Sequence, residues 1–203
     1  MREAANIEAL GTLAVDFIGF IFYPKSKRFV EQVPNLPLPS SIKRVGVFVN
    51  AEIEIIIETA TLFELDYLQL HGDESPAYCI ALKEQGFKLI KAFAVNDAFD
   101  FQQMDVYESC CDYFLLDAKG KDYGGNGIQF NWQLLQQYPS NKPFFLSGGI
   151  DLDSVAAIQA LDMSQLYALD INSKFETAPA LKNIDKIKQF HQALVEHPKR
   201  QQS

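Results

Sequence analysis

The chain has 203 residues, a formal net charge of −8 and a hydrophobic content of 48%. This length and composition are typical of one globular domain with a sizeable core. The acidic balance, with no basic stripe, predicts no nucleic-acid partner, and no apolar run approaches the roughly 20 residues that cross a bilayer, so we predict no membrane association.

Helix-like and strand-like patterns alternate along almost the whole chain. An amphipathic helix is predicted over residues 1–12, ahead of any strand. Short apolar runs rich in β-branched and aromatic residues follow, and they are typical of parallel strands that are buried on both faces. The seven predicted strands are residues 16–22, 44–50, 67–71, 88–95, 113–118, 143–147 and 167–171.

Helical patterns lie between these strands. They cover residues 51–65, 75–85, 99–108, 132–138, 153–160 and 183–195. Residues that favour helix starts stand at or near several of these boundaries, namely Asn50, Asp73, Asn131 and Asp151. No linker divides the chain, so we predict a single domain over 1–203 with a frayed polar tail over 197–203.

Strands separated by helices predict right-handed parallel crossovers, in either an open doubly wound sheet or a closed barrel. The barrel is favoured because polar residues and glycines follow the strands, on what would be one face. A closed (βα)8 TIM barrel begins with a strand. We therefore predict this α/β fold with the first strand missing from this chain, seven strands expected, and exposed edges on the strands that flank the gap.

The last two predicted strands are followed by segments suited to an anion. Gly148 and Gly149 permit close backbone approach to a ligand, and Asn172 and Ser173 favour the start of a short helix. Phosphate sites in barrels commonly lie after the seventh and eighth strands. A tight turn is the better explanation of an isolated Gly-Gly, but the two loops at these strand positions together favour a phosphate site.

Three other strand ends carry candidate site residues. Asp117 follows a buried apolar run, where a carboxylate suits acid–base chemistry or caps its own loop. Arg28, in a basic loop, is suited to gripping a carboxylate or phosphate, although a solvated turn is the simpler reading. His71 either contacts substrate or satisfies loop backbone. The glycine-rich segment 123–127 is a phosphate cradle or a flap.

The cysteines and histidines predict neither disulfides nor metal binding. Cys79, Cys110 and Cys111 form no even framework and no CxxC pair, and neighbouring cysteines do not readily bridge. We read them as reduced thiols of a cytoplasmic protein. The three histidines are too dispersed for a metal site.

Taken together, these motifs resemble the phosphoribosylanthranilate isomerase family of tryptophan biosynthesis, which has the (βα)8 fold. The resemblance runs from residue 1 to about residue 191, and its specificity lies in the order and spacing of the motifs. They are GFIFYPKSKRFV (19–30), VGVFVN (45–50), LQLHGDES (68–75), FLLDAKGKDYGGNG (114–127), FFLSGGI (144–150) and ALDINSKFETAPALKN (168–183).

The resemblance implies an Amadori rearrangement of N-(5′-phosphoribosyl)anthranilate without cofactor or metal. It implies that Asp117 is the general acid, that Arg28 grips the anthranilate carboxylate and that Asp170 lies near the substrate. The partner is then this small phosphoribosyl substrate, and the chain is a monomer or homodimer. The resemblance assigns phosphate binding to the main chain at Gly148, Gly149, Asn172 and Ser173.

The family's general base is a cysteine in a Lys-Val-Cys-Gly-like segment that ends the first strand. This chain begins at the Met-Arg-Glu that follows that segment, and Cys79, Cys110 and Cys111 lie away from the expected site. We therefore expect this chain to be poorly stable and impaired. We favour a start methionine internal to a longer natural chain over a real loss of the strand.

Two other readings stay open. Another phosphosugar barrel is possible in principle: an indole-glycerol-phosphate synthase would use Lys91 as its acid, whereas a ribulose-phosphate epimerase needs metal ligands that these histidines do not provide. A different class of function is a non-catalytic binder of a phosphosugar, left after loss of the base.

Overall fold

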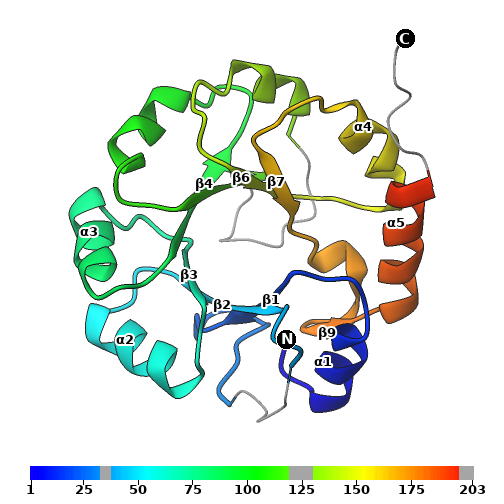
Figure 1. The fold of residues 1–203 in the computed structure, drawn as a ribbon, viewed down its shortest axis with the longest axis horizontal. Coiled ribbons are helices and arrows are strands. Elements are labelled where there is room, and N and C mark those ends of the chain that lie inside the picture. Colours follow the sequence, from blue (N-terminus) through cyan, green and yellow to red (C-terminus); the bar gives the residue numbers. More distant parts are fainter. Residues whose placement is uncertain (33–37, 119–129, 197–203) are drawn as a thin grey trace.

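The computed structural model describes residues 1–32, 38–118 and 130–196. In these residues seven parallel strands form one sheet in the order β1-β2-β3-β4-β5-β6-β7, and the helices lie around it (Figure 1). The predicted seven-stranded parallel α/β architecture is therefore confirmed. The strands are β1 (Phe17–Ile21), β2 (Lys43–Phe48), β3 (Tyr67–Leu70), β4 (Leu89–Val95), β5 (Tyr113–Ala118), β6 (Phe144–Leu146) and β7 (Leu166–Leu169).

The helical layer mixes α-helices with 3-10 segments. The α-helices are α1 (Ala4–Gly11), α2 (Ile53–Leu62), α3 (Pro76–Glu84), α4 (Val155–Ala160) and α5 (Ile184–Glu196), and the 3-10 segments are η1 (Phe101–Tyr107), η2 (Trp132–Gln137), η3 (Leu152–Ser154) and η4 (Ser173–Phe175). The α-helices expected over 99–108 and 132–138 are thus 3-10 helices. Their buried residues lie three apart, the spacing at which 3-10 side chains align.

Two of the four predicted helix starts are correct. The Asn131 side chain accepts a hydrogen bond from the Gln133 amide, and Asp151 forms a capping box. The other two are wrong: Ser75 caps α3, and α2 follows Glu52 without a side-chain cap. Asn50 instead has φ +48° and accepts a hydrogen bond from the Asp73 amide at 2.8 Å, because its side chain joins two loops.

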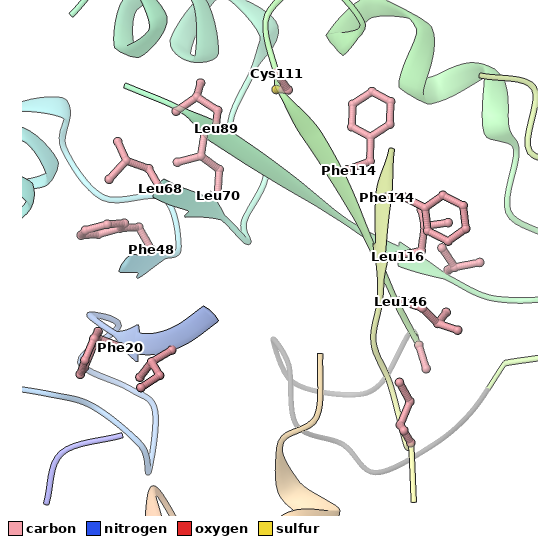
Figure 2. Close-up of a cluster of buried hydrophobic side chains, with 14 of the residues drawn as sticks. Phe20, Phe48, Leu68, Leu70, Leu89, Cys111, Phe114, Leu116, Phe144 and Leu146 are labelled. Carbon is pink, nitrogen blue, oxygen red and sulfur yellow. The ribbon is translucent and has the colours of Figure 1, made fainter. Parts of the chain in front are cut away.

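Strand alternation divides the buried side chains into two clusters. The inner cluster, within the curve of the sheet, contains Val45, Tyr67, Ile90, Ala92, Leu115 and Phe145. The residues between them along the strands, such as Leu68, Phe114 and Phe144, belong to the larger cluster that packs against the helices (Figure 2). This alternation decides which strand residues reach the inside of the barrel.

The described sheet has two edges. β1 pairs with β2 and β7 pairs with β6, and no hydrogen-bonded ladder joins β1 to β7 in the described part of the chain. A short antiparallel hairpin, which the sequence pattern does not predict, lies beside this opening; its strands are β8 (Glu176–Ala178) and β9 (Leu181–Lys182). The described helices include none that is both long enough and apolar enough to cross a bilayer. The predicted tail (197–203) lies outside the described residues.

Candidate active site

A cavity of about 380 Å³ extends from the carboxyl ends of the strands into the inside of the sheet. Loops after parallel strands line its mouth, and inner-cluster residues such as Ile90 and Leu115 line its depth. The eight residues that the sequence analysis assigns to the isomerase site all line this one cavity. They are Arg28, His71, Asp117, Gly148, Gly149, Asp170, Asn172 and Ser173.

Asp117 lies near the end of β5 and points inward. Leu115, two residues earlier, belongs to the inner cluster, so strand alternation places the Asp117 side chain on the same face. Asp117 is 6% exposed, and its Oδ2 lies 3.4 Å from His71 Nε2. The other ring nitrogen of His71 lies 2.8 Å from Gln69 Nε2. Gln69 thus holds the His71 imidazole against the buried carboxyl group of Asp117.

Asp170 follows β7, two strands along the sheet from Asp117, and lines the same cavity. Its Oδ2 accepts a hydrogen bond from Ser147 Oγ at 3.2 Å. Burial raises the pKa of Asp170, and the negative charge of Asp117 raises it further, against the opposing effects of Lys182 and His71. Two carboxyl groups therefore face one cavity, from the ends of β5 and β7.

The Gly148–Gly149 turn after β6 requires glycine on steric grounds. Gly148 has φ +91° and Gly149 has φ +66°, both in the left-handed region. A Cβ atom on Gly148 would also lie 2.5 Å from the Ala118 amide nitrogen, next to Asp117 on β5. The turn therefore passes directly against the strand that carries the buried carboxylate.

A cation that the sequence analysis missed, Lys182, contacts the loop after β7. Lys182 Nζ donates hydrogen bonds to Asn172 Oδ1 at 2.8 Å and to the Ile171 carbonyl oxygen at 3.3 Å. Burial lowers the pKa of Lys182, while the nearby Glu176 carboxylate opposes that shift. Lys182 stands on the two-residue strand β9, so no strand pattern in the sequence indicated that it reaches the site.

Arg28 lies in the cavity wall and is held by an acidic residue of the hairpin. Its Nε donates to both oxygens of Glu176, at 3.0 and 2.9 Å, and a terminal guanidinium nitrogen lies 2.7 Å from Glu176 Oε2. Burial alone would raise the pKa of Glu176, but Arg28 and Lys182 outweigh it and lower that pKa. Glu176, also missed from sequence, thus orients the guanidinium.

Lys91 does not face the cavity. Its Nζ contacts Glu74 Oε2 at 3.1 Å and the Gly72 carbonyl oxygen at 2.7 Å, and both side chains of the ion pair are at least 97% buried. The β4 residues on either side of it, Ile90 and Ala92, belong to the inner cluster, so Lys91 points toward the helices. It therefore cannot act as the acid of the indole-glycerol-phosphate synthase alternative.

Two further expectations concern the cysteines and the glycine-rich segment. Cys79, Cys110 and Cys111 are buried and none of them lines it. The glycine-rich segment 123–127 lies outside the described residues.

The chain is similar to known proteins along nearly its whole length. A family model described as N-(5′-phosphoribosyl)anthranilate (PRA) isomerase matches residues 1–193. A curated relative from Parabacteroides distasonis, named N-(5′-phosphoribosyl)anthranilate isomerase, is 46% identical over 203 residues, which cover 98% of this chain and 91% of the relative.

Solved structures agree with this match. The phosphoribosyl anthranilate isomerase from Thermus thermophilus is 25% identical with a TM-score of 0.83, and the match covers 97% of this chain and 96% of that one. A phosphoribosyl anthranilate isomerase in complex with reduced 1-(o-carboxyphenylamino)-1-deoxyribulose 5-phosphate is 31% identical with a TM-score of 0.74, over 94% and 91% of the two chains. This chain belongs to the N-(5′-phosphoribosyl)anthranilate isomerase family, the isomerases of tryptophan biosynthesis.

Proposed function

We propose that the cavity catalyses the Amadori rearrangement of N-(5′-phosphoribosyl)anthranilate to 1-(2-carboxyphenylamino)-1-deoxyribulose 5-phosphate. One observation carries the proposal: a buried carboxylate, Asp117, shares a single cavity with the Gly148–Gly149 turn and the loop at 172–173. The family match supports the choice of reaction. In this proposal the enzyme works in the cytoplasm on a small phosphoribosyl substrate, without a cofactor, as a monomer or homodimer.

Asp117 gives its proton to the ribose ring oxygen, and the ring opens. Its position supports this role, because the buried Asp117 side chain lines the cavity at the end of β5, within reach of a bound sugar. His71, 3.4 Å from Asp117 Oδ2, positions the carboxyl group and contacts the substrate. Removal of the C2′ proton then gives an enolamine that becomes the ketose.

The two ends of the substrate bind opposite sides of the cavity. Backbone amides at Gly148, Gly149, Asn172 and Ser173 hold the phosphate, and the missing side chains of the glycines allow close approach. Lys182, hydrogen-bonded to Asn172 Oδ1, adds a positive charge beside this loop. Arg28 takes the anthranilate carboxylate, with the guanidinium kept in place by Glu176.

The rearrangement also needs a group that accepts the C2′ proton. The lining of the described cavity contains no cysteine that could do so. The family resemblance assigns the acceptor to a cysteine that ends a further strand. We propose that such a strand fits between β1 and β7, whose facing edges make no ladder with each other in the described residues. Without it, turnover by the 203-residue chain should be about 10²–10⁴-fold slower, as is typical for loss of a general base.

Turnover measurements test the acid and the base separately. We expect an N-terminal extension with a strand ending in Lys-Val-Cys-Gly to raise kcat of the purified chain by about 10²–10⁴-fold. Asp117→Asn in the extended chain should lower kcat about 10²-fold or more. Asp105→Asn, which replaces an exposed carboxylate on η1, should leave kcat unchanged. Full turnover by the unextended chain would refute the proposed impairment. Retained turnover in Asp117→Asn would refute the acid.

A further inference from the structure

A compact cluster of three thiols lies apart from the substrate cavity. Cys79 is in the middle of α3, and Cys110 and Cys111 lie in the loop between η1 and β5. The three sulfur atoms all lie within 4.8 Å of one another, and the Sγ atoms of Cys110 and Cys111 are 4.0 Å apart. The residues are 0%, 2% and 4% exposed, respectively. None of them lines the cavity, so the proposed reaction leaves this cluster without a role.

We propose that Cys79, Cys110 and Cys111 form a binding site for one soft, thiophilic metal ion of the Zn²⁺ or Cu⁺ class. Thiolate sulfur selects such ions over hard cations. Zinc–sulfur bonds of about 2.3 Å place the sulfurs of one site about 3.8–4.0 Å apart, in tetrahedral or trigonal geometry. The observed spacing therefore needs side-chain adjustments of less than about 1 Å to hold an ion.

Hydrogen bonds between the thiols shift the pKa values of Cys79 and Cys111 in opposite directions. Hydrogen bonding from Cys111 lowers the pKa of Cys79, and the nearby Lys91 ammonium lowers it further, although burial and Glu74 act in the opposite direction. The same interaction raises the pKa of Cys111, because its proton is shared with the Cys79 sulfur.

Metal binding resolves this sharing of protons. A divalent ion would replace the thiol protons and bond to three sulfurs, releasing up to three protons to solvent. The complex would carry one net negative charge, near Lys91 and near Lys142, whose Nζ donates to the Cys111 carbonyl oxygen at 2.6 Å. The bound ion would join α3 to the segment that enters β5, so it should stabilise the folded chain.

A disulfide is the competing use of these thiols. Cys110 and Cys111 are adjacent in sequence and do not readily bridge each other, which leaves Cys79 with one of them and a third thiol unused. Their burial also protects them from an oxidant in solution. A shared ion uses all three sulfurs in their present places, and the geometry favours it for that reason.

Cadmium titration of the full chain, refolded under reducing conditions after chelator treatment, tests the site. Cd²⁺ is a suitable probe because sulfur-to-cadmium charge transfer absorbs in the ultraviolet. We expect one ion per chain, proton release on binding and a higher Tm. Cys79→Ser and Cys111→Ala should each weaken binding at least tenfold.

A matched control separates loss of a ligand from loss of packing. Met104→Leu changes a buried side chain of η1 but keeps every sulfur of the cluster, so its Cd²⁺ affinity should equal that of the unmodified chain. Substoichiometric binding in the unmodified chain, or binding that survives both cysteine substitutions, would overturn the proposal. So would an internal disulfide that forms readily while no ion binds.

Discussion

Asp170 is a site residue whose burial lowers the stability of the folded chain. Its pKa is raised in the folded chain, chiefly by burial and then by the charge of Asp117. An acid whose folded-state pKa is raised costs stability at pH values above that pKa, where it is ionised in both states. The cost disappears as the pH falls to the unfolded-state pKa, where the group is protonated in both states.

Asp170→Asn should therefore stabilise the chain at neutral pH. The amide removes the buried charge, and its oxygen can still accept the hydrogen bond from Ser147 Oγ. Thermal unfolding followed from pH 8 to pH 4 should show a gain in Tm at the alkaline end that shrinks toward pH 4, together with reduced turnover. A variant that is less stable than the parent at pH 8 would contradict this account of the Asp170 environment.

Gly148 makes a second residue-scale prediction with a matched control in the same chain. Gly148 and Gly86 have nearly equal φ angles, +91° and +88°, but a Cβ atom on Gly86 would meet nothing within 4 Å. Gly86→Ala should therefore cost only the backbone strain, about 1–3 kcal/mol. Gly148→Ala should cost more, because its Cβ would displace the Ala118 backbone.

The two alanine variants should differ in function as well. Gly148→Ala should weaken binding of the reduced product analogue at least tenfold in calorimetry, because the turn and β5 both border the proposed phosphate site. Gly86→Ala, in the loop after α3, should bind it as the parent does. Equal binding of the analogue by Gly148→Ala and the parent would show that this turn is not part of the phosphate site.

At the scale of elements, the β8–β9 hairpin supplies charges that the strands do not. Glu176 on β8 holds Arg28, and Lys182 on β9 contacts both Glu176 and the loop after β7. The side chains of Glu176 and Arg28 are 4% and 18% exposed, so their pairing is shielded from solvent. The hairpin thus connects the two sides of the cavity mouth.

Glu176→Gln should destabilise the chain by up to about 3 kcal/mol at neutral pH, because it leaves two partly buried cations, Arg28 and Lys182, without their carboxylate. Because the pKa of Glu176 is lowered in the folded state, this contribution is present above the unfolded-state pKa and is lost as the pH falls through the folded-state value. The parent and the variant should therefore converge in acid. Glu64→Gln, which breaks the exposed pair with Arg44, should have a much smaller effect.

Elements with a strong local pattern could be predicted from the sequence, and those fixed by distant contacts could not. The continuous apolar run before Asp117 sufficed to place this residue at a strand end, and the glycines after β6 required a turn. The strands β8 and β9 have three and two residues, too few for any pattern, so Glu176 and Lys182 were missed. Asn50 was misread because its side chain binds the amide of Asp73, 23 residues away.

At the scale of the molecule, strand order brings together residues that are far apart in sequence. Residues from the loop after β1 to the hairpin after β7 meet at one cavity because parallel strands end on the same side. The proposed extra strand belongs to this scale. It would pair with the edges of β1 and β7, and the extended chain should have a higher Tm than the 203-residue chain because closing a sheet removes exposed edges.

A crystal structure of the chain with reduced 1-(o-carboxyphenylamino)-1-deoxyribulose 5-phosphate is the most direct test of the shared cavity. The phosphate should lie against the main chain at Gly148–Gly149 and Asn172–Ser173, with the ribulose chain beside Asp117 and the carboxylate on Arg28. A phosphate bound elsewhere, or a sugar that leaves Asp117 without contact, would contradict the proposed active site.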